Sequence, residues 1–334
     1  MSRRLADVAK KVGVSEATVS RVLNGRPGVS DQTRQAILTA LDVLGYERPT
    51  KLRGDRARLV GLFLPELQNP IFPAFGEVVA SALAQNGFTP VLCTQTAGGI
   101  SEAEYVDLLL QQQVAGVVFM SGSHAVMNAD HKHFERLRGL GLPGVLVNGA
   151  YPSAGFATVS TDDESAAEQA YAHLVQLGHE RIGLLLGPVE HIPSQRKATG
   201  AQRAAHRTGV AIRDELVAHA HYSLETGQAA ATRLVTAGAT AIVCASDLMA
   251  LGAVRAVRRA GLRVPEDVSV IGYDDSALMN SVDPPLTTVR QPIDPMARMV
   301  IELLVSQVAG SASAPDEYLF EPELVVRAST APRP

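Results

Sequence analysis

Residues 5–24 of the chain read LADVAKKVGVSEATVSRVLN. Apolar residues recur at helical spacing on either side of one glycine, which predicts two short helices joined by a turn. Ser15 is a suitable N-cap for the second of these helices. A helix-turn-helix needs a small residue, a turn former and an apolar anchor near the helix crossing, and these fall at Ala9, Gly13 and Val19. The spacing therefore predicts a helix-turn-helix motif.

A third helix completes this head of the chain. Ser30 caps it in our interpretation. Its inward-facing apolar stripe comprises Ile37, Leu38, Leu41 and Leu44. We expect residues 1–45 to form a helix-turn-helix DNA-binding domain. Residues 46–58 are charged and are interrupted by Pro49 and Gly54, so we expect a hinge or linker there.

The second helix exposes a polar face, which comprises Glu16, Ala17, Ser20 and Arg21. A guanidinium can bind guanine O6 and N7 through two hydrogen bonds, and short polar side chains can bind phosphates. Residues 1–58 contain 12 Lys and Arg against 6 Asp and Glu, whereas the rest of the chain contains 18 against 28. This charge split favours DNA as a partner of the head alone. A helical hairpin with a solvated polar face is the alternative.

From residue 59 onward, short apolar runs alternate with stretches of helical periodicity. The apolar runs span residues 59–64, 90–93, 116–120, 144–147, 182–186, 241–245 and 268–272. This repeated βαβ pattern predicts parallel sheets covered on both faces, so the fold class is α/β. Residues 59–334 exceed what one sheet usually needs, which predicts two similar subdomains. We place their boundary near residues 150–160, with the C-terminal segment crossing back.

Polar and aromatic side chains follow several of these strands. They lie at residues 65–72, 121–124, 148–149, 187–191, 196–197, 246–247 and 273–275. Ligands of open α/β sheets bind beyond the carboxyl ends of the strands. Hydrogen-bond donors, a cation, a carboxylate and flanking rings are what a small polar ligand requires. The sequence thus predicts a cleft for such a ligand.

The composition excludes several other classes of protein. Hydrophobic residues make up 46% and charged residues 19%, which excludes a disordered chain. No apolar stretch reaches the ~18 residues of a membrane span, and no apolar signal-peptide core is present at the N-terminus. Cys93 and Cys244 lie in apolar runs, which fits a reducing cytoplasm rather than a disulfide scaffold.

Enzyme motifs are missing from the sequence. It contains no Walker segment and no nucleophile placed beside a base. His131 and His133 stand at i and i+2, where helical side chains point apart, so we interpret them as solvated surface rather than a metal site. We therefore expect no enzyme, no cofactor and no metal.

Residues 5–24 closely resemble the signature of the lactose/galactose repressor family (LacI/GalR type). The match continues through residues 29–30, 33–34 and 44–46, and in the body through residues 174–179, 247–252, 268–275 and 285–289. Periplasmic sugar-binding proteins are similar more distantly. Together with the exposed helix face, the resemblance implies DNA contacts by Leu5, Ser15, Glu16, Ala17, Thr18, Ser20, Arg21, Asn24, Ser30, Thr33, Leu52 and Arg53.

Leu52 has a special place in this set. In the family the connector folds into a hinge helix on DNA, and its leucine enters the minor groove, where an apolar wedge unstacks a base step. Here the segment from Tyr46 to Leu52 is shorter than the family's usual one and contains Pro49. The alternative is that Leu52 packs against the head or the body.

For the body, the resemblance implies an effector-binding and dimerisation domain over residues 59–334. The implied effector contacts are Phe72, Ser121, His191, Arg196, Lys197, Tyr222, Ser246, Asp247 and Asp274. A carboxylate at a strand end, such as Asp274, can accept two neighbouring hydroxyls or amines. Two positions depart from the sugar-responsive pattern: Ser246 replaces the usual Asn, and Lys197 replaces an Arg that could make a planar fork.

The resemblance implies a sequence-specific repressor that binds a pseudo-palindromic operator as a homodimer in the cytoplasm. No leucine heptad appears near the C-terminus, which favours dimers over tetramers. A carbohydrate is the expected effector. The alternatives are a nucleobase or other metabolite as effector, or a small-molecule-binding protein without specific operator docking. A transport-type binding protein would carry a signal peptide and lack residues 1–58.

Overall fold

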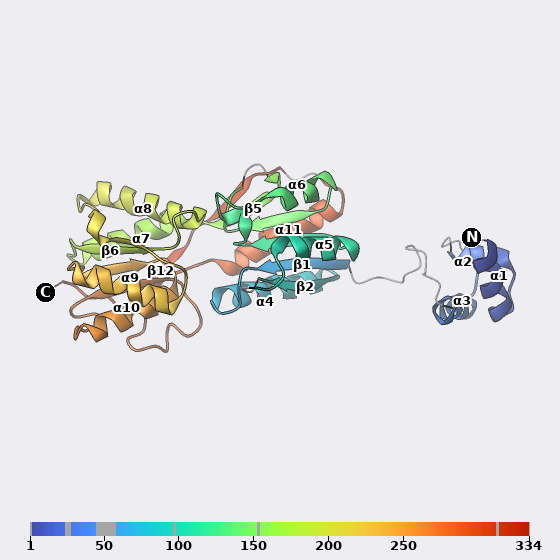
Figure 1. Cartoon of the computed structure of the whole chain (residues 1–334), viewed down its shortest axis with the longest axis horizontal. Helices are drawn as coiled ribbons and strands as arrows, with labels where there is room; N and C mark the ends of the chain where they lie inside the picture. The colour runs from blue at the N-terminus through green and yellow to red at the C-terminus, as the bar shows by residue number, and fades with distance from the viewer. Residues whose placement is uncertain are drawn as a thin grey trace. The chain divides into compact units, whose positions relative to one another are not determined.

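The computed structural model describes residues 2–23, 28–44, 58–95, 98–151, 154–311 and 314–333. The chain divides into two compact units, Met1–Arg58 and Leu59–Pro334. Figure 1 shows a small helical head and a larger α/β body.

Three helices form the head: α1 (Ser2–Val12), α2 (Glu16–Leu23) and α3 (Asp31–Val43). Their common core comprises Val8, Ala9, Val19, Val22, Ile37 and Ala40. Gly13 adopts φ +75° in the turn between α1 and α2, where glycine is favoured. The hydroxyls of Ser15 and Ser30 accept the backbone N–H of Thr18 and Thr33, each at 3.2 Å. Both predicted N-caps are therefore confirmed.

The body contains two six-stranded sheets. The first has the order β11-β5-β4-β3-β1-β2. Its strands are β1 (Arg58–Leu64), β2 (Phe88–Thr94), β3 (Gly116–Met120), β4 (Gly144–Val147), β5 (Ala157–Thr161) and β11 (Glu317–Phe320). The associated helices are α4 (Ile71–Gln85), α5 (Glu102–Gln111), α6 (Lys132–Gly139), α11 (Ile293–Val308) and the 3₁₀ turn η2 (Ser123–Ala125). Apolar clusters under α4 and α11 and under α5 and α6 cover this sheet.

The second sheet has the order β12-β10-β9-β8-β6-β7. Its strands are β6 (Ile182–Leu186), β7 (Val217–His219), β8 (Ala241–Cys244), β9 (Ser269–Asp274), β10 (Thr287–Arg290) and β12 (Glu323–Val325). The helices are α7 (Asp163–Gln176), α8 (Ile192–Thr208), α9 (Leu224–Thr236) and α10 (Asp247–Arg259), with the 3₁₀ turn η4 (Asp214–Leu216). Figure 1 shows α7 and α8 on one face and α9 and α10 on the other. The α/β class is confirmed, because both sheets consist mainly of parallel pairs covered by helices.

The chain crosses between the two sheets three times. It leaves the first sheet after Thr161, returns to it through α11 after Arg290, and leaves again between β11 and β12. The first crossing follows the residue 150–160 region, because β5 still pairs with β4 in the first sheet. None of the helices in the described part of the chain combines the length and apolar character needed to cross a bilayer.

Candidate functional site

The second helix of the head presents side chains to solvent. Ser15, Glu16, Ala17, Arg21 and Ser30 are exposed, and the side chains of Thr18, Ser20 and Thr33 are partly exposed. Val19 and Val22 face the opposite way and are fully buried. One face of α2 therefore anchors the helix, and the other remains free to contact a partner. The remaining predicted DNA contacts lie outside the described residues. These are Asn24, Leu52 and Arg53, together with the side chain of Leu5.

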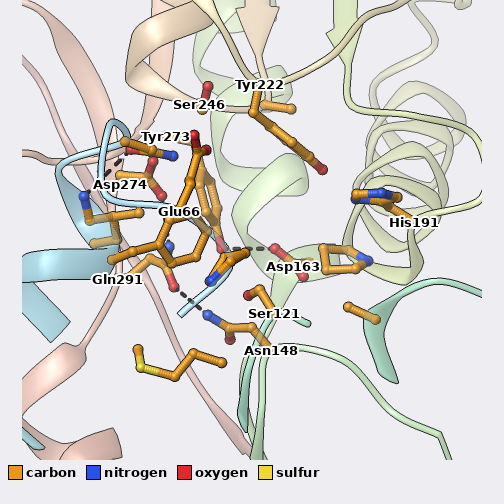
Figure 2. Close-up of a pocket in the computed structure, with 18 of the residues that line it drawn as sticks. Glu66, Ser121, Asn148, Asp163, His191, Tyr222, Ser246, Tyr273, Asp274 and Gln291 are labelled. Carbon is orange, nitrogen blue, oxygen red and sulfur yellow. Dashed lines mark hydrogen bonds between the residues drawn. The ribbon is translucent and has the colours of Figure 1, made fainter. Parts of the chain in front are cut away.

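The body contains a cavity of about 400 Å³ at the carboxyl ends of the strands of both sheets. Seven predicted effector contacts line it: Phe72, Ser121, His191, Lys197, Tyr222, Ser246 and Asp274. Figure 2 shows Tyr222 and His191 on one side of this cleft and Asp274 and Gln291 on the other. Ser246 is also the N-cap of α10, since its hydroxyl accepts the backbone N–H of Met249 at 3.3 Å.

Two predicted effector contacts do not line the cavity. Arg196 points to the first sheet, where its guanidinium donates two hydrogen bonds of 2.7 Å to Glu317. Asp247 is fully buried behind the wall, where its carboxylate accepts hydrogen bonds from Thr288 and from the backbone N–H of Ser276. In this structure both side chains support the wall of the cleft and do not form its surface.

Asp163 and Gln291 also line the cleft, although neither was predicted from the sequence as a site residue. Asp163 follows β5, and Gln291 follows β10, so both obey the strand-end rule. Their strands were not identified from the sequence, because β5 reads ATVST and β10 reads TTVR, without an apolar run. Recognising these polar strands would have identified both residues.

Asp163 and Lys197 form a buried ion pair inside the cleft. The lysine ammonium contacts Asp163 Oδ1 and also lies 3.7 Å from the centre of the Tyr273 ring. The Tyr273 hydroxyl donates to the same carboxylate oxygen at 2.7 Å. The positive charge of Lys197 is therefore neutralised by a protein carboxylate before any ligand binds.

Gln291 connects the two subdomains beside the cleft. Its side-chain oxygen accepts hydrogen bonds from Asn148 Nδ2 at 3.0 Å and from Thr161 Oγ1 at 2.8 Å, both at the end of the first sheet. Its amide nitrogen donates to Asp274 Oδ1 at 2.7 Å, at the end of the second sheet. One side chain thus joins the carboxyl ends of both sheets.

Two residues with carboxyl side chains and raised pKa values, Asp274 and Glu66, line the cleft. Asp274 Oδ2 is buried and has no hydrogen-bond partner within the described residues. Burial, with the negative charge of Asp247 adding to it, raises the pKa of Asp274 well above its usual range. Glu66 is half-buried, has no partner in the described part of the chain, and has its pKa raised by burial. The Glu66 carboxyl is therefore available to accept hydrogen bonds from a ligand, whereas Asp274 Oδ2 is covered by protein in this structure.

The other wall of the cleft carries aromatic rings. The rings of Tyr222 and His191 lie 5.7 Å apart between centroids. A Cβ at Gly187 would collide with the Tyr222 ring, so a glycine is required behind it. Burial is the main cause that raises the pKa of Tyr222 and lowers that of His191, so both rings stay neutral at physiological pH. They offer hydrogen bonds and a flat surface without charge.

The two subdomains also touch across the mouth of the cleft. Val126 forms a β-bridge with His191, and the backbone N–H of Met127 donates to the carbonyl of Glu190 at 3.0 Å. The Arg196–Glu317 pair adds a third link. These contacts link the two subdomains beside His191, which lines the cleft.

Two histidines that follow Val126 and Met127 in the chain differ from the prediction made from the sequence. His131 and His133 are 8% and 9% exposed, so the prediction of a solvated surface was wrong. His133 Nε2 lies 2.6 Å from Glu102 Oε1, Ser123 Oγ also contacts Glu102, and His131 Nε2 lies 2.8 Å from the Ser123 carbonyl. Burial opposes ionisation of Glu102, but these hydrogen bonds outweigh it and lower its pKa. The cluster anchors the loop, and the described residues contain no group of three or more His, Cys, Asp or Glu that could hold a metal.

Known proteins share this arrangement of a helical head and a two-sheet body. Residues 4–49 match the family described as bacterial regulatory proteins, lacI family, and residues 171–330 match a periplasmic binding protein-like domain. The HTH-type transcriptional regulator MalR of Streptomyces coelicolor is 52% identical over 338 residues, which cover 100% of this chain and 98% of MalR.

Solved structures agree with these matches. A transcriptional regulator CelR–cellobiose complex is 32% identical, with a TM-score of 0.73, over 97% of this chain and 99% of that one. A lac repressor dimer bound to operator and the anti-inducer ONPF is 27% identical, with a TM-score of 0.74, over 97% and 98% of the two chains. The resemblance predicted from residues 5–24 is confirmed over the full length of the chain. This protein is a transcriptional regulator with a helix-turn-helix DNA-binding head, and it belongs to the lacI family of bacterial regulatory proteins.

Proposed function

We propose that this regulator is a cytoplasmic repressor that binds a pseudo-palindromic operator as a homodimer and is controlled by a carbohydrate in its cleft. The cleft chemistry carries the proposal. A cavity of about 400 Å³ lies in the range of ~300–1,000 Å³ that small-molecule sites occupy. It combines carboxyl side chains with neutral aromatic rings.

A neutral polyhydroxy compound fits this chemistry best. Glu66 and Asp274 line the cleft, and carboxyl oxygens can accept the hydrogen bonds that ligand hydroxyls donate. Lys197 is neutralised by Asp163, so the described residues that line the cleft offer an anionic ligand no unpaired cation. The flat faces of Tyr222 and His191 suit a sugar ring. The CelR structure, which holds cellobiose, supports the same ligand class.

The head supplies the DNA-binding half of the function. Glu16, Ala17 and Arg21 lie on the exposed face of α2, which we assign to the major groove. We assign contacts with backbone phosphates to the polar residues Ser15, Thr18, Ser20, Asn24, Ser30 and Thr33, and Leu5 is a further proposed DNA contact. Leu52 and Arg53 are assigned to a hinge that contacts the minor groove. The lac repressor structure, a dimer bound to operator, supports the dimeric arrangement.

Effector and DNA are coupled through the two subdomains. Gln291 and the contacts at the mouth of the cleft span both sheets, so an effector between them changes how the subdomains meet. We propose that this change reaches the residues that join the body to the head and alters affinity for DNA. Thermodynamic reciprocity then requires DNA to alter effector affinity by the same factor.

The test begins with selection of binding sites from random duplex DNA by the purified full-length protein. The enriched site is then titrated with cellobiose, maltose, ribose and adenine. We expect a palindromic site and a change in its affinity with one of the sugars. Enrichment of a palindrome that responds to adenine alone would contradict the carbohydrate assignment. No enriched site would contradict the repressor assignment.

A further inference from the structure

Asp247 has an unexplained position behind the wall of the cleft. It is the first residue of α10, it is fully buried, and it forms no ion pair within the described residues. Its Oδ1 accepts a hydrogen bond from Thr288 Oγ1 at 2.6 Å, and its Oδ2 accepts one from the Ser276 N–H at 2.8 Å. A buried carboxylate without a cation is costly, which suggests a role beyond packing.

The surrounding strands hold this carboxylate close to Asp274. Gly272 pairs with Thr288 across β9 and β10, and a Cβ at Gly272 would collide with Asp247 Oδ1. Side chains two residues apart on a strand project from the same face, roughly 7 Å apart along the strand. Asp247 therefore fills the space over Gly272 on the same face from which Asp274 projects.

Asp247 also holds the turn that carries Asp274. Asp274 and Asp275 have φ values of +121° and +54°, a region that favours glycine. Two successive residues of other types in this region persist only when the surroundings hold them there. The hydrogen bond from the Ser276 N–H to Asp247 fixes the end of this turn. The direction in which the Asp274 carboxyl points thus depends on Asp247.

The charges around Asp274 are mostly negative. The charged groups that face it from neighbouring elements are Asp247 of α10, Asp163 of α7, Lys197 of α8 and Glu66 of the loop after β1. The other titratable groups around the cavity are His191, His221, Tyr222 and Tyr273. Lys197 is bound to Asp163, and Asp275 is neutralised by Arg290 and Arg327. Asp247 and Asp274 therefore share a buried region without a cation of their own.

We propose that Asp247 is a positioning residue of the effector site, which keeps a proton on Asp274 in the empty cleft and fixes the direction in which the Asp274 carboxyl points. Burial raises the pKa of Asp247 to about 6, and burial with repulsion from Asp247 raises the pKa of Asp274 well above its usual range. A ligand hydroxyl that donates to Asp274 stabilises the ionised carboxylate. Binding of a polyol then releases this proton to solvent, and its affinity rises with pH.

The first experiment needs no ligand. Infrared spectroscopy of the full-length protein follows the C=O stretch of protonated carboxyl groups as the pH rises. We expect a band that persists at neutral pH and is absent from Asp274→Asn. In Asp247→Asn, where the amide oxygen can still accept the Ser276 N–H, the band should titrate at lower pH by one unit or more, about a tenfold loss of proton affinity. Asp267→Asn is the control, since this carboxylate is paired with Arg263.

Two results of this experiment would overturn the proposal. One is the absence of a protonated carboxyl group at neutral pH in the wild-type protein. The other is an Asp274 titration that is the same in Asp247→Asn as in the wild type. A change of the same size in Asp267→Asn would show that any lost charge has this effect, which also contradicts a specific role for Asp247.

A second experiment tests the link to ligand, and this link rests on the proposed carbohydrate function. Cellobiose is titrated calorimetrically in two buffers that differ in protonation enthalpy. We expect release of a proton from the wild type and a smaller release from Asp247→Asn at the same pH. Proton uptake, or equal release by both proteins, would contradict the proposal. If cellobiose does not bind, the ligand assignment fails, while the infrared result still decides the role of Asp247.

Discussion

Lys197 shows how a single residue determines the charge of the cleft. Its ammonium is almost fully buried against Asp163 and lies over the Tyr273 ring. A lysine at a ligand site usually indicates an anionic ligand, but here a protein carboxylate already neutralises it. The sequence motif identified Lys197 but not its partner Asp163. Because Asp163 neutralises the lysine, the cleft suits a neutral ligand better than an anionic one.

Removing this lysine tests the buried pair. We expect Lys197→Met to lower the free energy of unfolding by about 3–5 kcal/mol, because Asp163 would remain buried without its cation. Arg207→Met is the matched control, since Arg207 pairs with Glu168 on the surface and 60% of its side chain is exposed. That change should cost less than about 1 kcal/mol. Urea denaturation measures both, and equal losses would contradict the distinction.

Asp247 should make the free energy of unfolding depend on pH. Because its pKa is raised to about 6 from 3.8, its contribution to stability is complete below 3.8 and is lost as the pH rises through about 6. The unfolding free energy of Asp247→Asn, relative to wild type, should therefore increase by about 1–3 kcal/mol from pH ~5 to pH ~8. Chemical denaturation across this range measures the difference, and a constant difference would contradict the raised pKa.

At the scale of elements, strand recognition determined which site residues could be predicted. The strands before Ser121, His191, Ser246 and Asp274 contain apolar runs, and the strand-end rule placed those residues correctly along the cleft. β5 and β10 consist largely of Thr, Ser and Arg. These segments form strands because they pair with the buried strands β4 and β9, and not because of an apolar run of their own. Asp163 and Gln291 were missed for this reason.

Other features depend on contacts that sequence spacing does not contain. Asp247 follows a strand, as a ligand contact would. Its carboxylate nevertheless lies behind the wall of the cleft, because Thr288 donates a hydrogen bond to it and Gly272 leaves space for it. His131 and His133 occupy a helix start that spacing alone assigns to the surface, yet the cluster around Glu102 buries them. Long-range packing decides both cases.

The exposed face of α2 can be tested through Arg21. Arg21 is exposed and lies opposite the buried anchors Val19 and Val22, so Arg21→Ala should leave stability within about 0.5 kcal/mol of wild type. It should lower discrimination between the selected operator and a base-substituted duplex by about 1–3 kcal/mol, because a bidentate contact to guanine is lost. Fluorescence anisotropy with both duplexes measures this. Equal weakening on both would assign Arg21 to phosphate binding instead.

At the scale of the whole molecule, we expect contacts across the cleft to affect the rate at which a ligand dissociates. Arg196 and Glu317 join the two subdomains through two hydrogen bonds, and both side chains are mostly buried. Glu317→Gln removes the charge of this link, so a bound effector should dissociate roughly fivefold faster, equivalent to about 1 kcal/mol. Glu168→Gln is the control, because Glu168 pairs with Arg207 within the second subdomain. Equal rates for the two variants would contradict a role for the link in closure.

We propose that the cleft and the head act as one coupled system. The most direct measurement is the affinity of the full-length protein for its effector, determined by calorimetry with and without saturating operator DNA. We predict that operator changes effector affinity by the factor by which effector changes operator affinity, a coupling of about 1–3 kcal/mol, or roughly 5–150-fold. An effector affinity that is the same with and without operator would contradict the account.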